Sequence, residues 1–545
     1  MRKHIIYILG ILLILSVSQC AKRGIPTGGS KDSLPPVLIK ANPPLNTVFF
    51  DEEKITLEFD EYIKLNNITT QLVTSPPLEP FQYKISPETT VSKKVQIEFL
   101  DSLKPNITYT FNFGSAIEDF NEQNPLTYFS YTFSTGSVID SLFLEGTVKD
   151  AYEKETDEFI SVHLYPVDST FTDSTIYNKK PFYISNTLDS VYFKLQNLSA
   201  GTYEMIALKD EGKNYLFDQN IDKIGFFKEP VKLPGDSIRF PVLFKEIPNF
   251  GWSRPQYINN HHIIFGYFGD VTGETIDLVS EVDEDFKYLI TKHTESDTLD
   301  FWYSGVEKID SLVFNLSDKD SLKQVVIKPA KPKIDSLEFS FSHKRFLDFM
   351  DTLSIKATLP VVKLDESLIE IRDIDSVIVP FKSLINEHKN EIIFDFNKTL
   401  NDSYTIQILP NAVTDFWGDT NDTLTTKLQT KKLENYGVII LNVETDGDYN
   451  YFIELIDSAG KTIRKYLKNE YGKYTFNYLN PGDYGVRLVK DINENNKWDT
   501  GNYLKKIQPE EVIYMEGEIT LRANWDQNET FIVKGRSLDL QENLE

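Results

Sequence analysis

Short segments in which apolar and polar residues alternate run through the chain, and this pattern constrains its fold more than any other feature. Examples are "KITLEFDEYI", "TYTFNFG", "VYFKLQNL", "LSIKATLP" and "NEIIFDFN". They are rich in Ile, Val, Thr, Tyr and Phe and are bounded by Pro, Gly, Asn and Asp, which is typical of strands with one buried face. Closely spaced strands separated by turn residues predict an all-β chain of tandem β-sandwich domains.

One stretch of the first half of the chain recurs near the C-terminus without a gap. The segment "NLSAGTYEMIALKDEGKNYLFDQN", from Asn197, aligns with "YLNPGDYGVRLVKDINENNKWDTG", from Tyr478, at a shift of 281 residues. The identical pairs are Leu198/Leu479, Gly201/Gly482, Tyr203/Tyr484, Lys209/Lys490, Asp210/Asp491, Asn214/Asn495 and Asp218/Asp499. Identities in one register over so short a span indicate that the same module occurs twice. Each copy resembles the prealbumin-like (CnaB or carboxypeptidase-regulatory) β-sandwich.

A second kind of module begins at a paired proline. Residues 35–136 contain "PPVLIKANPPLN", "LEFDEYI", "TYTFNFGSAIEDFNEQN" and "FSYTFSTG", in that order. This order resembles the bacterial Ig-like domain of the S-layer (SbsA) type. The resemblance implies that Tyr109 is a core aromatic residue and that Asp119, with Asn121 and Asn124, caps the backbone amides of a turn. A divergent copy, "DSYTIQILPNAVTDFWGDTND", places Tyr404 and Asp415 at the corresponding positions.

The N-terminus predicts export and lipid attachment. A basic start and the apolar run "IIYILGILLILSV" lead to Cys20, the only cysteine of the chain. The apolar run is too short to span a membrane and has the length of a signal-peptide core. A cysteine at this point resembles the bacterial lipobox, although Gln19 departs from the usual small residue. We therefore expect lipidation of Cys20, and the segment that follows, rich in Gly, Pro, Ser and Lys, reads as a flexible tether.

These features predict an ordered series of domains, and the whole arrangement resembles the Ig-like-domain lipoproteins of Bacteroidetes. The segments are a lipoprotein signal peptide (1–19), an acylated Cys20 with its tether (20–36), an SbsA-type Ig-like domain (37–136), a first prealbumin-like module (137–246), an unassigned β-rich domain (247–334), a second Ig-like domain (335–430), a second prealbumin-like module (431–535) and a tail (536–545). The resemblance implies anchoring in outer-membrane lipid through Cys20, and it leaves open whether the chain faces the cell surface or the periplasm.

The loop "KDINENNKWDTGNY" of the second module is the candidate metal site. Asp491, Asn493 and Asn495 offer oxygens at alternating positions, Lys497 could offer its carbonyl, and Asp499 occupies the ninth position of a calcium loop. The loop lacks the glutamate of the twelfth position, because residue 502 is Asn502. The alternative is an Asx-rich turn that caps its own backbone. Calcium is therefore a possible cofactor, and no other is expected.

No catalytic set is expected, and we predict that the chain is not an enzyme. It contains no Gly-x-Ser-x-Gly, His-Glu-x-x-His, phosphate-loop or dinucleotide motif. His261 and His262 point to opposite faces if they lie on a strand, so they would not share a metal. Neighbouring carboxylates such as Asp60 and Glu61 are more typical of a solvated surface than of an acid–base pair.

Composition restricts the partners. The formal net charge of −25 disfavours nucleic acid and anionic lipid headgroups, so envelope proteins are the expected partners. The leading hypothesis is a non-enzymatic scaffold or docking subunit, as an accessory of an outer-membrane complex or as a surface interaction protein. The alternative is a carbohydrate-binding or glycan-processing surface lipoprotein, for which exposed tryptophans would form the platform. Of these, Trp498 and Trp525 are expected inside their module.

Overall fold

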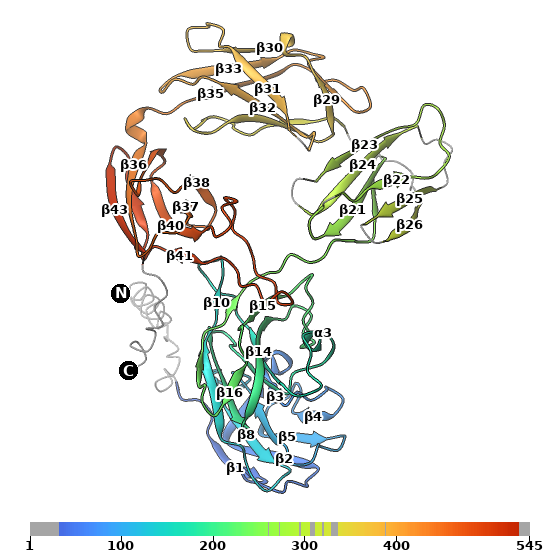
Figure 1. Cartoon of the computed structure of the whole chain (residues 1–545), viewed down its shortest axis with the longest axis vertical. Coiled ribbons are helices and arrows are strands. Elements are labelled where there is room, and N and C mark those ends of the chain that lie inside the picture. The colour runs from blue at the N-terminus through green and yellow to red at the C-terminus, as the bar shows by residue number, and fades with distance from the viewer. Residues whose placement is uncertain are drawn as a thin grey trace, which may run out of the picture. The chain divides into compact units, whose positions relative to one another are not determined.

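A computed structural model of the chain describes residues 32–259, 261–271, 273–293, 296–305, 311–318, 321–328, 336–386 and 388–533. The signal peptide, Cys20 with most of the tether, and the tail predicted from the sequence lie outside these residues. Almost all of the regular elements are strands, as Figure 1 shows, so the prediction of an all-β fold is confirmed. Among the described residues, no helix is long and apolar enough to cross a bilayer.

The chain divides into two compact units. Unit 1 comprises residues 1–143, 182–188 and 195–200, and unit 2 comprises residues 144–181, 189–194 and 201–545.

Unit 1 contains a sandwich of two antiparallel sheets. The larger sheet contains β1 (Leu38–Asn42), β2 (Lys54–Leu65), β5 (Ser92–Phe99) and β4 (Tyr83–Ser86), with β7 (Ile117–Asp119) paired to β2; the smaller contains β3 (Val73–Ser75), β6 (Thr108–Asn112) and β8 (Ser130–Ser134). A single helical turn, α2 (Ile68–Gln71), precedes β3. Alternate residues of β2, including Leu57 and Phe59, are buried in the core. Tyr109 is also buried and stacks on Phe133 at a centroid distance of 5.5 Å, so the core role expected of Tyr109 is confirmed.

Residues 137–246, predicted as the first prealbumin-like module and called the first module below, contribute most of their strands to unit 2. These strands are β9 (Leu142–Thr147), β10 (Lys149–Asp150), β11 (Ser161–Pro166), β13 (Tyr192–Leu198), β14 (Gly201–Lys209), β15 (Lys223–Phe226), β16 (Val231–Leu233), β17 (Ile238–Arg239) and β18 (Val242–Leu243), with the short helix α3 (Thr175–Asn178). Strand β12 (Tyr183–Asn186) falls within unit 1, and the boundary between the units runs through β9 and β13. Strand β14 lies at the centre of its sheet, because β11, β15 and β16 all pair with it antiparallel.

The region for which the sequence suggests no family is also made of strands. Its larger sheet contains β19 (Gly251–Trp252), β21 (His262–Phe268), β24 (Thr298–Ser304), β23 (Lys287–Lys292) and β20 (Gln256–Asn259), and its smaller sheet contains β22 (Ile276–Leu278), β25 (Leu312–Ser317) and β26 (Leu322–Ile327). Phe265, Phe301 and Phe314 meet edge to face in its core, at centroid distances between 4.9 and 6.2 Å.

The following strands repeat the pattern of the N-terminal Ig-like region. They are β27 (Phe339–Phe341), β28 (Leu353–Ala357), β29 (Val361–Leu364), β30 (Ile369–Arg372), β31 (Phe381–Ile385), β32 (Glu391–Phe396), β33 (Ser403–Ile408), β34 (Val413–Asp415) and β35 (Leu424–Gln429), with a 3-10 turn η1 (Glu366–Leu368). Asp119 accepts hydrogen bonds from the amides of residues 122, 123 and 124, and Asp415 accepts them from residues 417, 418 and 419. The capping role expected of Asp119 is therefore confirmed and recurs at Asp415.

The C-terminal strands, in the segment predicted as the second prealbumin-like module and called the second module below, repeat those of the first module. They are β36 (Gly437–Thr445), β37 (Tyr451–Asp457), β38 (Thr462–Leu467), β39 (Lys473–Leu479), β40 (Gly482–Lys490), β41 (Val512–Tyr514), β42 (Ile519–Leu521) and β43 (Asp526–Val533), after a 3-10 turn η2 (Leu433–Asn435). Strands β39 and β40 begin and end 281 residues after β13 and β14. Even a left-handed backbone position recurs, with φ of 59° at Asn197 and 57° at Tyr478.

Both tryptophans expected inside the second module lie elsewhere. Trp525 has 53% of its surface exposed and lies beside the guanidinium of Arg522, so the expectation that it fills the sandwich was wrong. Trp525 lies directly before β43, and the first residue of that strand is also exposed. The regular alternation of buried and exposed residues begins only further along β43. Trp498 is half-buried, and it packs against the core cluster of the first module.

Candidate functional site

The loop that follows β40 closes on Asp491, the first residue of the predicted calcium series. Asp491 is 1% exposed, although it carries a carboxylate. Its Oδ1 accepts a hydrogen bond from the amide of Asn495 at 3.1 Å, and its Oδ2 accepts one from the amide of Asn496 at 2.9 Å. The left-handed φ of 61° at Asn496 turns the backbone toward this carboxylate. Asp491 thus holds the loop by accepting its backbone amides.

The other side chains of the series gather at Asp499. Asn493 and Asn495 each donate a side-chain amide hydrogen bond to Asp499 Oδ2, both at 2.7 Å. The backbone amide of Lys497 donates to Asn495 Oδ1, also at 2.7 Å. The structure therefore brings Asn493, Asn495 and Asp499 together. The asparagine side chains thus donate through Nδ2 to Asp499, while the Oδ1 atoms of Asn493 and Asn495 each accept the backbone amide two residues on, as expected of an Asx-rich turn.

Glu510 completes the loop, and the sequence pattern did not identify it. Its Oε1 accepts the amide of Ile492 at 2.7 Å and its Oε2 accepts the amide of Asp499 at 3.0 Å. Burial raises the pKa of Glu510 above its ordinary value of 4.5, the two amide bonds lower it, and the charges of Asp499 and Asp491 raise it further. Glu510 therefore adds a third carboxylate to the neighbourhood of the loop.

The sister loop of the first module has the same skeleton. Asp210 Oδ2 accepts the amide of Tyr215 at 2.7 Å, as Asp491 accepts that of Asn496. Asp222 accepts the amides of Glu211 and Asp218 at 2.9 and 2.8 Å, which is the role of Glu510 in the second module. This counterpart is the signal that could have revealed Glu510, but the two carboxylates do not align at the shift of 281.

Carboxylate and amide oxygens are ligands that calcium accepts, so the donor set at residues 491–499 is chemically suitable. Within the described part of the chain, no three His, Cys, Asp or Glu side chains are placed to hold a metal ion together. A calcium ion would therefore need the asparagine carbonyl oxygens and a rotation of the amides that now donate to Asp499. Calcium binding stays a prediction, with Asp491, Asn493, Asn495, Lys497 and Asp499 as its residues.

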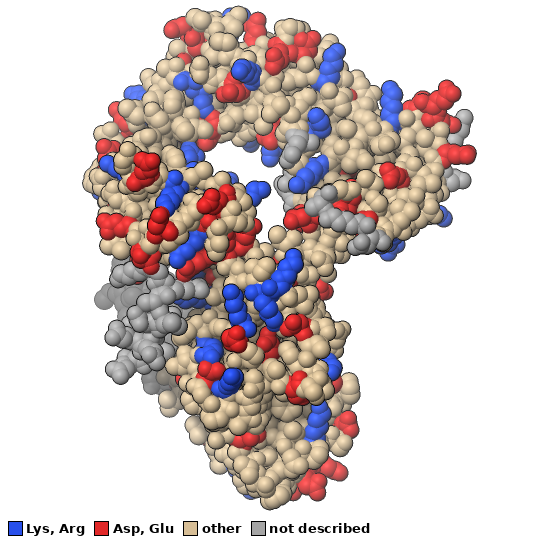
Figure 2. Space-filling model, viewed as in Figure 1, with Lys and Arg blue, Asp and Glu red and all other residues tan. Residues whose placement is uncertain are grey.

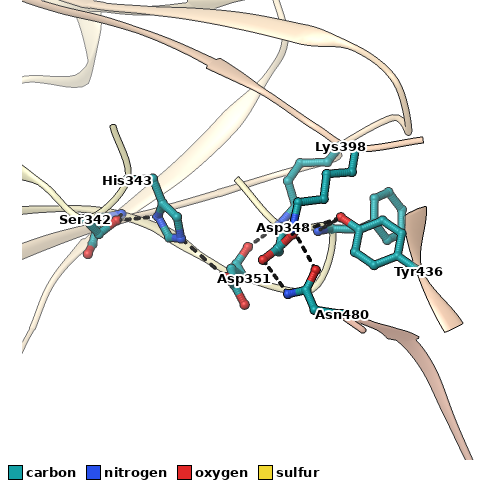
Figure 3. A network of polar contacts seen from close by, with 10 residues as sticks. Ser342, His343, Asp348, Asp351, Lys398, Tyr436 and Asn480 are labelled. Atoms are coloured by element: carbon teal, nitrogen blue, oxygen red, sulfur yellow. Dashed lines mark hydrogen bonds and ion pairs between the residues drawn. The ribbon is translucent and has the colours of Figure 1, made fainter. Parts of the chain in front are cut away.

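A second polar centre joins Asp348, in the segment predicted as the second Ig-like domain, to Tyr436 and Asn480 of the second module (Figure 3). The carboxylate of Asp348 forms an ion pair with Lys431 Nζ at 2.8 Å. It also accepts hydrogen bonds from the side-chain amide of Asn480 at 2.8 Å and from the hydroxyl of Tyr436 at 3.3 Å. Lys431 also donates to Asn480 Oδ1 at 2.7 Å, which closes a triangle with Asp348. Burial opposes ionisation of Asp348, but the hydrogen bonds from Lys431 and Asn480 outweigh it and lower the pKa of Asp348. This network joins two modules by charge-assisted hydrogen bonds.

Histidines occupy structural positions in the described residues. His262 is buried in β21 and its Nε2 lies 2.7 Å from Asp300, while His293 approaches the same carboxylate at 3.0 Å. His261 precedes the strand with a left-handed φ of 58°, and its neighbour His262 stacks on Trp302. Asp60, one of the carboxylates considered for acid–base chemistry, accepts the amide of Val37 at 2.8 Å. None of these contacts assembles a nucleophile with a base.

The remaining tryptophans pack on other aromatic or backbone groups. Trp302 and Trp417 meet edge to face at 6.0 Å, and the indole of Trp417 donates to the carbonyl of Tyr303. The indole of Trp252 donates to the carbonyl of Ser317 at 3.0 Å. Figure 2 shows acidic and basic side chains in scattered groups, separated by larger areas of other residues.

Comparison with known proteins identifies one domain of the chain. Residues 32–135 match the bacterial Ig-like domain family. No curated protein matches the chain. Among solved structures, it is similar to BcpA, the major pilin subunit of Bacillus cereus, at 11% identity over 72% of this chain and 99% of that chain, with a TM-score of 0.15. The Bacillus anthracis TIE protein matches at 11% identity over 94% and 76% of the two chains, with a TM-score of 0.14. Domains 1–6 of the surface layer protein SbsC match at 8% identity over 90% and 68%, with a TM-score of 0.16.

Proposed function

We propose that the chain is a non-enzymatic lipoprotein scaffold, anchored in the outer membrane through Cys20, that docks envelope proteins on a series of β-sandwich modules. The observation that carries the proposal is the network around Asp348, where Lys431 and Asn480 fix one module against the next. A chain whose modules are joined by such contacts holds them in fixed relative positions. A docking platform requires this, and a set of freely linked domains does not provide it.

Anchoring rests on the sequence around Cys20 and is tested separately from docking. Acyl chains on Cys20 stabilise membrane attachment by about 0.8 kcal/mol per buried methylene group, so a triacylated chain stays in the membrane. Mass spectrometry of the mature N-terminus should show a lipid-modified Cys20, and Cys20→Ser should move the chain to the soluble fraction. Gln19→Ala restores a small residue before the cysteine and is the matched control, which should stay in the membrane fraction. An unmodified Cys20 in the membrane fraction would refute lipid anchoring.

Docking is tested by purification from the native envelope in mild detergent after crosslinking. We expect stoichiometric recovery of at least one envelope protein with the full chain. Recovery of the chain alone, under conditions in which Cys20 is lipidated, would contradict the scaffold role and leave the anchor intact.

The glycan-binding alternative needs exposed aromatic side chains that converge on one face. Trp302 and Trp417 pack on each other instead, and Trp498 packs against the first module. No described contact therefore favours a glycan platform over the scaffold. A polysaccharide pull-down that retains the chain, and loses it after Trp525→Ala, would reverse this preference.

A further inference from the structure

The second prealbumin-like module contains an insertion that the first one lacks. In the first module the carboxylate of Asp222 accepts the amide of Asp218, four residues earlier. In the second module Glu510 accepts the amide of Asp499, eleven residues earlier. The second loop is thus seven residues longer between equivalent positions. Its extra residues form a small hairpin closed by Asn502 and Ile507, whose backbones exchange hydrogen bonds of 2.8 and 2.9 Å; residues 500–509 are called the inserted hairpin below.

The tip of the inserted hairpin enters the hydrophobic core of the first module. Tyr503 is fully buried, and the other buried residues of its cluster all come from the first module, between Ala151 and Phe244. Its ring meets the ring of Phe226 edge to face at 5.2 Å. A Cβ atom at Gly501 would lie 2.6 Å from the ring of Phe244, so the backbone approaches this core as closely as only glycine allows. The core of the first module is therefore completed by a residue of the second.

Hydrogen bonds hold the hairpin backbone against the end of the first module. The amide of Tyr503 donates to the buried carboxylate of Glu246, and the hydroxyl of Thr500 donates to the carbonyl of Lys245. The side-chain amide of Gln508 donates to the carbonyl of Phe226 at 3.0 Å. These three contacts come from both arms of the hairpin, so they fix its orientation as well as its position.

Lys506 adds a charged contact beside the buried tyrosine. Its Nζ lies 3.8 Å from the centroid of the Tyr503 ring, a cation–π geometry. The same Nζ pairs with Asp173 at 3.0 Å and with Glu204 at 3.1 Å. The Glu204 side chain is only 7% exposed, so Lys506 supplies a positive charge to a carboxylate that lies largely away from solvent.

The first module inserts a tyrosine into the second in return. Arg487 donates from Nη2 to the Tyr152 hydroxyl at 2.6 Å, and the Tyr514 hydroxyl donates to the Tyr152 carbonyl at 2.7 Å. The ring of Trp498 lies 4.8 Å from that of Tyr152. This contact explains why Trp498 does not fill its own module. Each module thus receives one tyrosine of the other.

We propose that the first module is the receptor of the inserted hairpin and that its receptor surface selects an aromatic residue followed, three positions later, by a cation. Phe226, Phe244 and Glu246 receive the aromatic residue and the adjoining backbone, while Asp173 and Glu204 receive the cation. The two prealbumin-like modules, far apart in the sequence, then unfold as one cooperative body. Residues 247–430 connect the two modules along the chain, so both ends of this segment are attached to the same cooperative body.

Loop exchange tests the proposal in the full chain. Residues 500–509 are replaced by Gln219, Asn220 and Ile221, the segment that joins Asp218 to Asp222 in the first module. Because the two loops share a skeleton, the second module should keep its fold. We expect hydrogen-exchange protection near Phe226 and Phe244 to fall roughly tenfold or more, with protection around Ile439 and Phe476 unchanged, and the shared thermal transition to split in two. Unchanged protection near Phe226 would overturn the proposal.

A single substitution keeps the test decisive if the exchanged chain fails to fold. Tyr503→Ala should lower protection near Phe226 and Phe244, whereas Tyr471→Ala, at a position 86% exposed in the same module, should not. Lys506→Gln tests the contact of the cation separately from the contact of the aromatic ring. It should lower hydrogen-exchange protection near Glu204, by a smaller factor than Tyr503→Ala lowers it there. Equal protection in Tyr503→Ala and Tyr471→Ala chains would overturn the proposal.

Discussion

Tyr109 and Tyr404 make the same hydrogen bond in two different regions of the chain. The Tyr109 hydroxyl accepts the backbone amide of Lys104 at 3.0 Å, and the Tyr404 hydroxyl accepts that of Thr399 at 2.7 Å, five residues upstream in both cases. A tyrosine that bonds to backbone a few residues earlier is the tyrosine corner of Ig-like sandwiches.

A threonine completes both corners. Thr135 donates to the carbonyl of Lys104 at 2.7 Å, and Thr430 donates to the carbonyl of Thr399 at 2.6 Å. Residues 399–430 therefore share this local arrangement with the region that matches the bacterial Ig-like domain, although they lie outside that match.

Removing the hydroxyl of either tyrosine should destabilise its own sandwich. Tyr404→Phe leaves the amide of Thr399 without its partner, and a lost hydrogen bond of this kind costs about 1 kcal/mol. Denaturant unfolding should show this decrease, and Tyr109→Phe should show a similar one in the other sandwich. Tyr471→Phe is the matched control, because Tyr471 is largely exposed. A change for Tyr404→Phe no larger than that of the control would contradict the corner role.

Arg487 and Glu454 form a buried ion pair that should tolerate joint replacement better than single replacement. Arg487 Nε lies 2.7 Å from Glu454 Oε2, and the two side chains are 3% and 8% exposed. Arg487→Met leaves a buried carboxylate without its cation, and such losses cost about 3–5 kcal/mol. The double variant Arg487→Met/Glu454→Leu should recover part of this loss, measured as the free energy of unfolding. A double variant less stable than Arg487→Met would show that the pair is not the source of the effect.

Acid should stabilise the loop closed by Glu510. Burial is the main cause of the raised pKa of Glu510 in the folded chain, so folding takes up a proton there. The resulting stability is fully present below the unfolded-state pKa, near the ordinary value of 4.5, and is lost as the pH rises through the folded-state pKa. The free energy of unfolding, measured from about pH 5 to 8, should therefore decline less with rising pH in Glu510→Gln than in the natural chain. An identical slope in both would exclude Glu510 as its source.

Sequence patterns predicted local structure well and long-range contacts poorly. The alternation of buried and exposed residues in β2 is a pattern within one short segment, and β40 repeats the local sequence of β14, so a single sequence reveals both. Glu510 escaped because the insertion displaces it from Asp222 in the alignment. The burial of Tyr503 escaped for a different reason: its core is formed by residues more than 250 positions earlier, and no local period reports such a contact.

Calcium should raise the melting temperature of the chain only if the asparagines at residues 491–499 turn their carbonyl oxygens toward Asp499. The structure has both Asn493 and Asn495 donating to Asp499, so binding must replace these hydrogen bonds by metal contacts. Thermal unfolding with millimolar calcium, repeated with magnesium, measures the effect, since extracellular sites of this charge bind at about 10⁻⁴–10⁻³ M. Asn493→Gly should abolish the rise, because it gives the second loop the glycine that the first loop has at Gly212. Gly212→Asn is the complementary variant and leaves the calcium loop untouched, so the rise should persist in it. A rise that survives Asn493→Gly would assign calcium to another place in the chain, and no rise in the natural chain would leave the loop as a self-capped turn.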